Sequence, residues 1–142
     1  MLSVYDILCS KGQTVHSVAP DDTVLHALSV MAKHEIGAVL VIEEEKLIGI
    51  LTERDYARRV VLMGRSSRDS AIRDVMTSQV VCVGPDRSVS DCMALMTDRR
   101  VRHLPVVREK RVVGIVSIGD LVKATIADQE YVITQLQAYI AG

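Results

Sequence analysis

The chain has 142 residues, of which 49% are hydrophobic and 25% are charged, and its formal net charge is -1. This composition excludes a disordered tail and is typical of a globular protein with one compact core, or with two small ones that share an interface. No apolar run approaches the roughly 20 residues that span a bilayer, and the first residues lack a signal-type stretch, so we expect a cytoplasmic protein.

The first predicted elements are a helix, a strand and a second helix. Ser3 and Asp6 have the spacing of a capping box for a short helix that ends near Gly12. Residues 14–18, T-V-H-S-V, alternate like a short strand. P-D-D-T then supplies a turn and a helix cap, and the apolar residues that follow, from Val24 to Met31, recur at helical spacing.

Two buried strands and a further helix are predicted next. The apolar runs A-V-L-V-I (38–42) and L-I-G-I-L (47–51) are separated by E-E-E-K, which is typical of a hairpin of buried strands. A helix begins near Thr52. The order is therefore strand, helix, strand, strand, helix. The first two strands should lie parallel, with a right-handed crossover, because a helix joins them.

The second half of the chain repeats the first at a shift of 65 positions. Without a gap, G-I-L-T-E-R-D (49–55) aligns with G-I-V-S-I-G-D (114–120). Upstream, V-Y-D-I-L-C-S (4–10, here called lead-in 1) resembles I-R-D-V-M-T-S (72–78, lead-in 2) at a shift of 68. The period is longer than that of solenoid repeats, so we expect two copies of a small domain.

The predicted fold class is α+β, built from α/β-type repeats. Each copy is a βαββα unit with a three-stranded sheet. A unit of about 60 residues buries little surface alone, so the two copies should pack sheet to sheet about a pseudo-two-fold axis. We expect an N-terminal helix and the first copy in residues 1–68, the second copy in 69–127, and a helical extension in 128–142. Equivalent positions would then face each other across a cleft.

The repeated hydroxyl and carboxylate have two interpretations. Thr52 with Asp55, and Ser117 with Asp120, have the spacing of a capping box, which needs no ligand. Alternatively, the amides at the start of a helix that follows a buried strand form a natural anion site for a phosphate. A carboxylate beside it can accept both hydroxyls of a ribose. The residues alone leave both interpretations open.

As a whole, over about residues 4–127, the chain resembles a tandem pair of cystathionine-beta-synthase-type (CBS) domains, called a Bateman module. The motifs that carry the resemblance are D-V-M-T (74–77), V-A-P-D (18–21), V-G-P-D (83–86), R-H-L-P-V-V (102–107) and the two heptapeptides at 49–55 and 114–120. The resemblance implies a non-catalytic regulatory module. Such a module binds an adenine nucleotide, AMP, ADP, ATP or NAD(H), in the cleft between its copies.

The site residues of the family carry over onto positions of this chain. The resemblance implies that Asp55 and Asp120 hold ribose, and that Thr52 and Ser117 contact phosphate. Further phosphate contacts are expected from Arg54, Arg58 and Arg59 in the first copy, and from Arg102 or His103 in the second. The implied base pocket comprises Val15, His16, Ala38, Val80 and Val81.

The two copies differ beside the expected phosphate position. Glu53-Arg54 in the first copy becomes Ile118-Gly119 in the second. This change removes charge and predicts unequal ligands or affinities. Arg58 and Arg59 can equally form a solvated helix face, and His103 can equally be a hydrogen-bonded structural residue of an apolar strand.

We expect no metal site, no catalytic residue and no disulfide framework. Cys9, Cys82 and Cys92 are odd in number and form no C-x-x-C pair, so they should be reduced thiols. The histidines lack an H-E-x-x-H context. A nucleotide-hydrolysing enzyme is an alternative function, but the sequence contains neither a nucleophile-base pair nor a Walker-type G-x-x-x-x-G-K.

The expected partners are a second copy of the chain and a separate regulated protein, with no membrane partner. In the last helix, Val122, Ile126, Ile133, Leu136 and Ile140 follow a seven-residue pattern, interrupted at Gln129. This stripe packs either on its own domain or on a second subunit, and the resemblance favours the second. The remaining alternative is nucleic acid bound by the six arginines between positions 54 and 73. The net charge and the 3% aromatic content argue against it.

Overall fold

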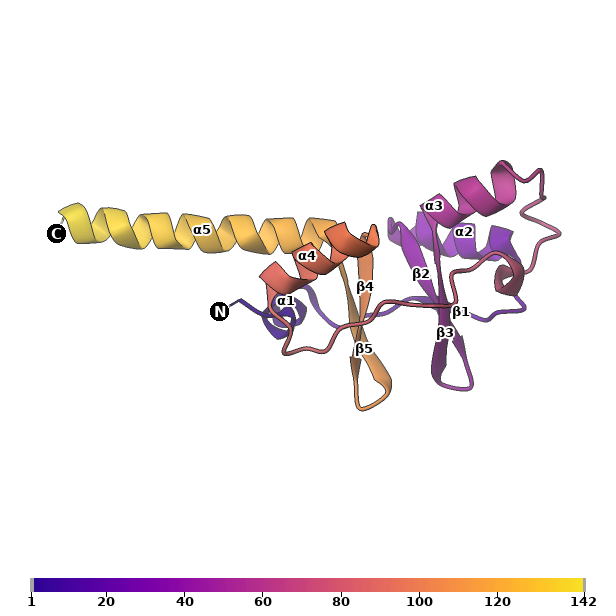
Figure 1. The fold of residues 1–142 in the computed structure, drawn as a ribbon, viewed down its shortest axis with the longest axis horizontal. Coiled ribbons are helices and arrows are strands. Elements are labelled where there is room, and N and C mark those ends of the chain that lie inside the picture. The colour runs from indigo at the N-terminus through magenta and orange to yellow at the C-terminus, as the bar shows by residue number, and fades with distance from the viewer. Residues whose placement is uncertain (1, 142) are drawn as a thin grey trace. The chain divides into compact units, whose positions relative to one another are not determined.

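The structure is a computed structural model that describes residues 2–141, and it divides the chain into two compact units (Figure 1). The first-repeat unit comprises Thr14–Val81 and Glu109–Val112. The second-repeat unit comprises the residues up to Gln13, Cys82–Arg108 and the residues from Val113 onward. The contacts within the structure therefore place each copy of the repeat in one unit with the lead-in of the other copy. The predicted division into copies in sequence order stays a prediction.

The first-repeat unit follows the predicted order of strand, helix, strand, strand and helix. Its elements are β1 (Ser17–Val18), α2 (Val24–His34), β2 (Ala38–Glu43), β3 (Lys46–Thr52), α3 (Glu53–Asp55), the π-helical η1 (Tyr56–Val61) and the 3-10-helical η2 (Ile72–Asp74). The sheet order is β1-β2-β3. Strand β1 pairs with β2 in parallel, as the helical crossover requires, and β2 pairs with β3 in antiparallel orientation. β1 is shorter than the predicted 14–18 because only Ser17 and Val18 pair with β2.

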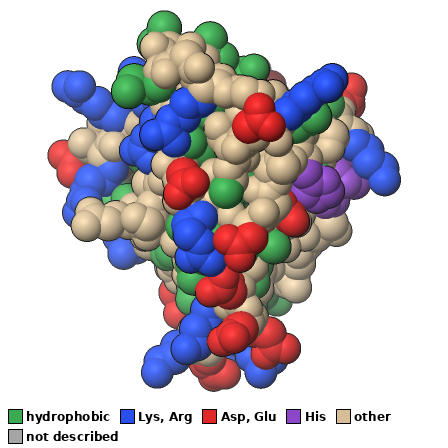
Figure 2. All heavy atoms as spheres, turned by 90° about the vertical axis from the view of Figure 1, so that its right-hand side faces the viewer, with side chains coloured by type: hydrophobic (Ala, Val, Ile, Leu, Met, Phe, Trp, Pro, Cys, Tyr) green, Lys and Arg blue, Asp and Glu red, His purple; other side chains and the backbone are tan. Residues whose placement is uncertain are grey.

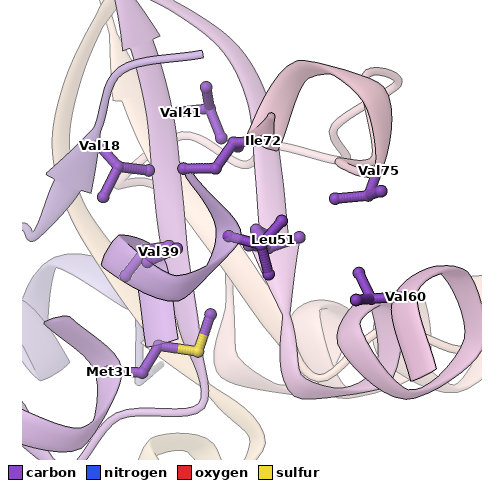
Figure 3. Packing of buried hydrophobic residues seen from close by; sticks show 10 residues of the cluster. Val18, Met31, Val39, Val41, Leu51, Val60, Ile72 and Val75 are labelled. Carbon is purple, nitrogen blue, oxygen red and sulfur yellow. The ribbon is translucent and has the colours of Figure 1, made fainter. Parts of the chain in front are cut away.

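The core of the first-repeat unit joins the sheet to lead-in 2. Figure 3 shows Val39 and Leu51 of the sheet in one cluster with Met31 of α2 and with Ile72 and Val75 of lead-in 2. Each of these side chains is at most 4% exposed. Burial of one aliphatic side chain contributes about 1.5–3 kcal/mol. Hydrophobic packing therefore holds lead-in 2 in the unit of the first copy.

The second-repeat unit contains α1 (Val4–Lys11), α4 (Val89–Arg99), β4 (His103–Arg108), β5 (Arg111–Ser117, apart from its first two residues) and α5 (Ile118–Ala141). Its sheet has two strands, β4 and β5. The strand expected at the start of this copy is reduced to a single parallel bridge between Val83 and Val106, in which Val83 N donates to Pro105 O at 3.1 Å. Gly84-Pro85 follows at once, and proline lacks the N–H that would extend the pairing.

Helix α1 has the cap that the sequence predicts. Asp6 N donates a hydrogen bond to Ser3 Oγ (3.4 Å), and Ser3 N donates one to Asp6 Oδ2 (2.9 Å). The helix ends at Lys11, and its C-cap is Gly12, whose φ of 97° lies in the region that favours glycine. The N–H of Val4 donates to Arg87 O (2.9 Å), which joins α1 to the second copy.

Helix α5 has 24 residues and buries only its beginning. Leu121 is fully buried, but every residue from Ile126 to Ala141 is exposed. Figure 1 shows this part of α5 extending past α1 and α4 of the same unit. Within residues 2–141, no helix combines the length and the apolar character that a membrane crossing requires.

Candidate functional site

The first candidate site lies where β3 ends and α3 begins. Thr52 is the N-cap, and its Oγ1 accepts a hydrogen bond from Asp55 N (3.1 Å). Asp55 Oδ2 in turn accepts hydrogen bonds from Thr52 N (3.0 Å) and Thr52 Oγ1 (3.1 Å). The capping box predicted for the first copy is therefore confirmed, and it sets the direction of the Asp55 carboxylate.

Lead-in 2 supplies a further contact to this carboxylate. Thr77 Oγ1 donates to Asp55 Oδ1 (3.1 Å), and the backbone of Thr77 exchanges two hydrogen bonds of 2.9 Å with Ile50 of β3. Asp55 is only 8% exposed. A β-carbon at Gly49 would collide with the side chain of Met76 and lie 3.0 Å from Thr77 O. The glycine that opens the heptapeptide is therefore needed for the close approach of lead-in 2.

The second candidate site lies where β5 ends and α5 begins. Ser117 N donates to Asp120 Oδ2 (2.8 Å), and Asp120 N donates to Ser117 Oγ (3.1 Å), so the capping box recurs. Here the contact from the lead-in side is ionic, because Lys11 at the end of α1 donates from Nζ to Asp120 Oδ2 at 2.7 Å. A β-carbon at Gly114 would lie 2.6 Å from Cδ2 of Leu8, so this helix also crosses a glycine closely.

The Asp120 carboxyl is shifted toward its ionised form. Burial raises its pKa, but the hydrogen bonds from Lys11 and Ser117 and the charge of Lys11 outweigh burial, so the pKa lies below its ordinary value. The Asp120 side chain is 24% exposed. The site therefore presents a charged acceptor that a solute can reach.

Some of the backbone amides at the start of each helix already donate hydrogen bonds to acceptors within the protein. Glu53 N donates to Gly37 O (3.1 Å), and Ile118 N donates to Arg102 O (2.9 Å). The third amide of each helix donates to the N-cap hydroxyl. Two of the first three amides in each helix therefore donate to protein acceptors, so an anion at either site would also need side-chain donors.

The three arginines predicted to contact phosphate in the first copy have different surroundings in the structure. Arg59 Nη1 donates to Val75 O (3.2 Å) and Met76 O (2.7 Å), which fastens lead-in 2 to η1. Arg54 and Arg58 lie on the exposed surface. Figure 2 shows Lys and Arg side chains interleaved with Asp and Glu on the visible face, with no single basic patch.

In the second copy, the predicted phosphate contacts lie at the start of β4. The hydrogen bond from Ile118 N to Arg102 O brings the backbone of the exposed Arg102 to the start of α5. His103 is the first residue of β4 and is partly buried. The structure thus brings Arg102 next to the second candidate site through its backbone.

The residues of the predicted base pocket are all partly or fully buried: Val15, His16, Ala38, Val80 and Val81. His16 O accepts a hydrogen bond from Leu40 N (3.2 Å), and its ring stacks on that of His34, with the centroids 3.6 Å apart and an interplanar angle of 17°. Burial, followed by the charges of His16 and Lys33, lowers the pKa of His34. His34 was not predicted, because no local pattern connects the end of α2 with the start of β1.

Within residues 2–141, no cluster of three or more His, Cys, Asp or Glu side chains is suited to a metal ion. Cys9 is exposed, Cys82 is partly buried and Cys92 is buried. Burial raises the thiol pKa of both Cys82 and Cys92, which favours the unreactive protonated form. The expected absence of a metal stays a prediction.

Comparison with known proteins identifies the repeat. The family model of the CBS domain matches residues 4–62 and 72–127. The mitochondrial CBS domain-containing protein CBSX3 of Arabidopsis thaliana is 39% identical over an alignment of 149 residues. The alignment covers 99% of this chain and 72% of that protein. The crystal structure of the CBS domain of NE2398 has a TM-score of 0.84 and 48% identity, and the match covers 87% of this chain and 97% of that chain.

A structure solved with ligands is also similar. The CBS domain pair of protein MJ0100, in complex with 5′-methylthioadenosine and S-adenosyl-L-methionine, has a TM-score of 0.80 and 25% identity. The match covers 90% of this chain and 98% of that chain. Both ligands of that protein contain an adenosine group.

Proposed function

We propose that this chain, which belongs to the CBS domain family as a tandem pair of domains, is a non-catalytic sensor of adenine nucleotides that transmits its ligand state to a partner protein. The observation that carries the proposal is the duplicated arrangement of Thr52 with Asp55 and of Ser117 with Asp120, each fixed where a strand ends and a helix begins. The adenosine-containing ligands of the similar MJ0100 pair support the choice of ligand class.

The chemistry of the two sites suits a ribose that carries phosphate. A carboxylate accepts hydrogen bonds from both hydroxyls of a ribose, and the caps hold Asp55 and Asp120 in place before a ligand arrives, which limits the ordering that binding requires. Arg54 and Arg102 are exposed next to the two helix starts and would give phosphate oxygens charged donors. His16, supported by its stacked neighbour, would offer a ring face to the base. The predicted position of the ligands between the copies stays a prediction.

Calorimetric titration of the full chain with AMP, ADP, ATP and NAD(H) tests the proposal. We expect two binding events, of which Asp55→Ala removes one and Asp120→Ala the other. Thr23→Ala is the matched control, because it removes the N-cap of α2 without touching either carboxylate. This variant should keep both events. Unchanged isotherms in both aspartate variants would reduce these carboxylates to helix caps.

We also propose that a second copy of the chain covers the exposed part of α5. Ile126, Ile133, Leu136 and Ile140 of the apolar stripe are between 50% and 82% exposed. Their seven-residue spacing is that of a coiled-coil seam, interrupted at Gln129. Analytical ultracentrifugation should give a dimer for the wild type and a monomer for the double variant Ile133→Asp/Leu136→Asp. A monomeric wild type would contradict this part of the proposal.

The alternative functions have less support from the side chains. Arg73, one of the six arginines considered for nucleic acid, pairs with Asp21 (3.3 Å) and Glu43 (2.8 Å), and Arg59 donates to backbone carbonyls. A salt-dependent gel shift would nevertheless establish nucleic-acid binding. Product formation above background on incubation with ATP would establish hydrolysis. A cytoplasmic location remains part of the proposal.

A further inference from the structure

The second copy lacks a cation inside its own heptapeptide. In the first copy Arg54 follows Thr52 by two positions, but Gly119 occupies the equivalent position after Ser117. A phosphate bound beside Asp120 would therefore meet a carboxylate with no compensating charge from the same motif. Repulsion between the two anions would weaken binding.

Lys11 brings a positive charge to this position from the other end of the sequence. Its Nζ lies 2.7 Å from Asp120 Oδ2 and 3.0 Å from Ile115 O. Lys11 is the last residue of α1, and the Leu8 side chain of the same helix lies against Gly114. Packing of α1 therefore sets the place of the ammonium group at the start of α5.

The ammonium group has the capacity to bind a ligand as well. It carries three protons and no acceptor, and it donates one to Asp120 and one to Ile115. The third can be donated to an anionic oxygen. The Lys11 and Asp120 side chains are 36% and 24% exposed, so a solute can reach the pair.

In the first copy, the contact to the carboxylate from the lead-in side carries no charge. There the contact from the lead-in to the carboxylate is the neutral hydroxyl of Thr77, at 3.1 Å from Asp55 Oδ1. The contact from Thr77 therefore adds no charge at the start of α3, whereas the contact from Lys11 adds a full positive charge at the start of α5.

We propose that Lys11 is a specificity-determining residue of the site at the start of α5. It selects ligands that carry an anionic group beside the ribose, such as nucleoside monophosphates, over uncharged nucleosides. The inference rests on the proposed function, since it requires that Asp120 receives the ribose.

Titration of the full chain followed by amide NMR measures the two sites separately. The Gly119 amide reports on the start of α5, and the Arg54 amide reports on the start of α3. The wild type, Lys11→Met and Lys11→Arg are each titrated with AMP and with adenosine. Lys46→Met, which removes an exposed lysine from the start of β3, is the control with the same change of charge. Lys11→Gln is a second neutral variant should methionine perturb α1.

At Gly119, Lys11→Met should weaken AMP binding about tenfold and change adenosine binding by less than about twofold. Lys11→Arg should keep most of the preference for AMP because it keeps the charge. At Arg54, and in Lys46→Met, the affinities should equal those of the wild type.

Two outcomes would overturn the inference and leave the proposed function standing. One is an unchanged ratio of AMP to adenosine affinity at Gly119 in both neutral variants. The other is tighter AMP binding in these variants, which would make Lys11 a competitor of the ligand for Asp120. If neither ligand shifts Gly119 in the wild type, the proposed function fails at this site and the inference fails with it.

Discussion

The two helix starts carry the same capping box, yet the contacts from the lead-in side give their carboxylates different surroundings. Asp55 is 8% exposed and accepts a hydrogen bond from the neutral hydroxyl of Thr77. Asp120 is more exposed and pairs with the ammonium of Lys11. The motif therefore determines the direction of the carboxylate, and a segment outside the motif determines its burial and its electrostatic environment.

The two carboxylates therefore differ in what dominates their surroundings, which is packing at Asp55 and electrostatics at Asp120. Around Asp55, lead-in 2 is held by buried side chains such as Ile72 and Val75, so a substitution there should act on stability. Around Asp120, the contact with Lys11 is open to solvent, where ion pairs contribute little to stability. A substitution there should act on ligand choice and on pH dependence.

Adding one methyl group to the first glycine of each heptapeptide should give the largest difference in stability between the two units. Gly49→Ala should lower the free energy of unfolding by about 2–3 kcal/mol, and Gly114→Ala by about 1 kcal/mol. The first substitution presses on the backbone carbonyl of Thr77 as well as on Met76, whereas the second meets the flexible end of Leu8. Urea unfolding of the two variants measures both values. Equal losses would contradict this ranking.

Removing the side-chain contact that reaches each carboxylate from the lead-in side should give a smaller difference in stability, in the same direction. Thr77→Val takes a hydrogen bond from the buried Asp55 and should lower the free energy of unfolding by about 1–2 kcal/mol. Lys11→Met removes an exposed ion pair and should lower it by at most about 0.5 kcal/mol. Thr97→Val, on the exposed surface of α4, is the control for the change of side chain. A larger loss for Lys11→Met than for Thr77→Val would show that the ion pair is the stronger structural contact.

The pH dependence of stability should distinguish the two carboxylates further. The folded-state pKa of Asp120 is lowered, so its contribution is fully present above the unfolded pKa and is lost as the pH falls through the folded pKa. The stability difference between the wild type and Asp120→Asn should therefore shrink below about pH 4. In a Lys11→Met background this dependence should weaken, since Lys11 is the main group that lowers the pKa. A difference that stays constant from about pH 6 to pH 3 would refute the assignment.

The smallest expected effect concerns the stacked histidines of the first-repeat unit. The pKa of His34 is lowered, so the neutral ring stabilises the folded state above the unfolded pKa of about 6.5, and this contribution is lost as the pH falls. His16→Ala removes the ring that stacks on it, together with its charge and part of the burial. NMR titration should then show the His34 pKa moving up toward its ordinary value. An unchanged His34 pKa would mean that His16 does not influence it.

The features that sequence reasoning predicted depend on short-range patterns. The caps at Thr52 and Ser117 follow from residues three positions apart, and the parallel pairing of β1 with β2 follows from the helix between them. The contacts of Lys11 were not predicted, because it lies 109 positions from Asp120 and looks like any surface lysine in the sequence. The packing of each lead-in on the opposite copy likewise depends on long-range contacts between buried side chains. No local sequence pattern identifies the partners in these contacts.

The strand expected at the start of the second copy shows a second limit of local patterns. Residues 80–83, V-V-C-V, are as apolar as the strand of the first copy, but only Val83 pairs with β4. The structure shows that propensity alone did not decide the pairing here, since strand preferences depend on neighbouring strands. None of the predicted ligand contacts could be decided by such patterns, because the same hydroxyl and carboxylate complete a cap with or without a ligand.

Asp55 and Asp120 are the residues that we propose to hold the ribose of an adenine nucleotide. Calorimetry of the double variant Asp55→Ala/Asp120→Ala with AMP tests this proposal most directly, beside a Thr23→Ala/Ser88→Ala control that removes the N-caps of α2 and α4. We expect the double aspartate variant, still folded, to lose all detectable AMP binding while the control binds as the wild type does. AMP binding by the aspartate variant with wild-type affinity and stoichiometry would show that these carboxylates do not hold the ribose.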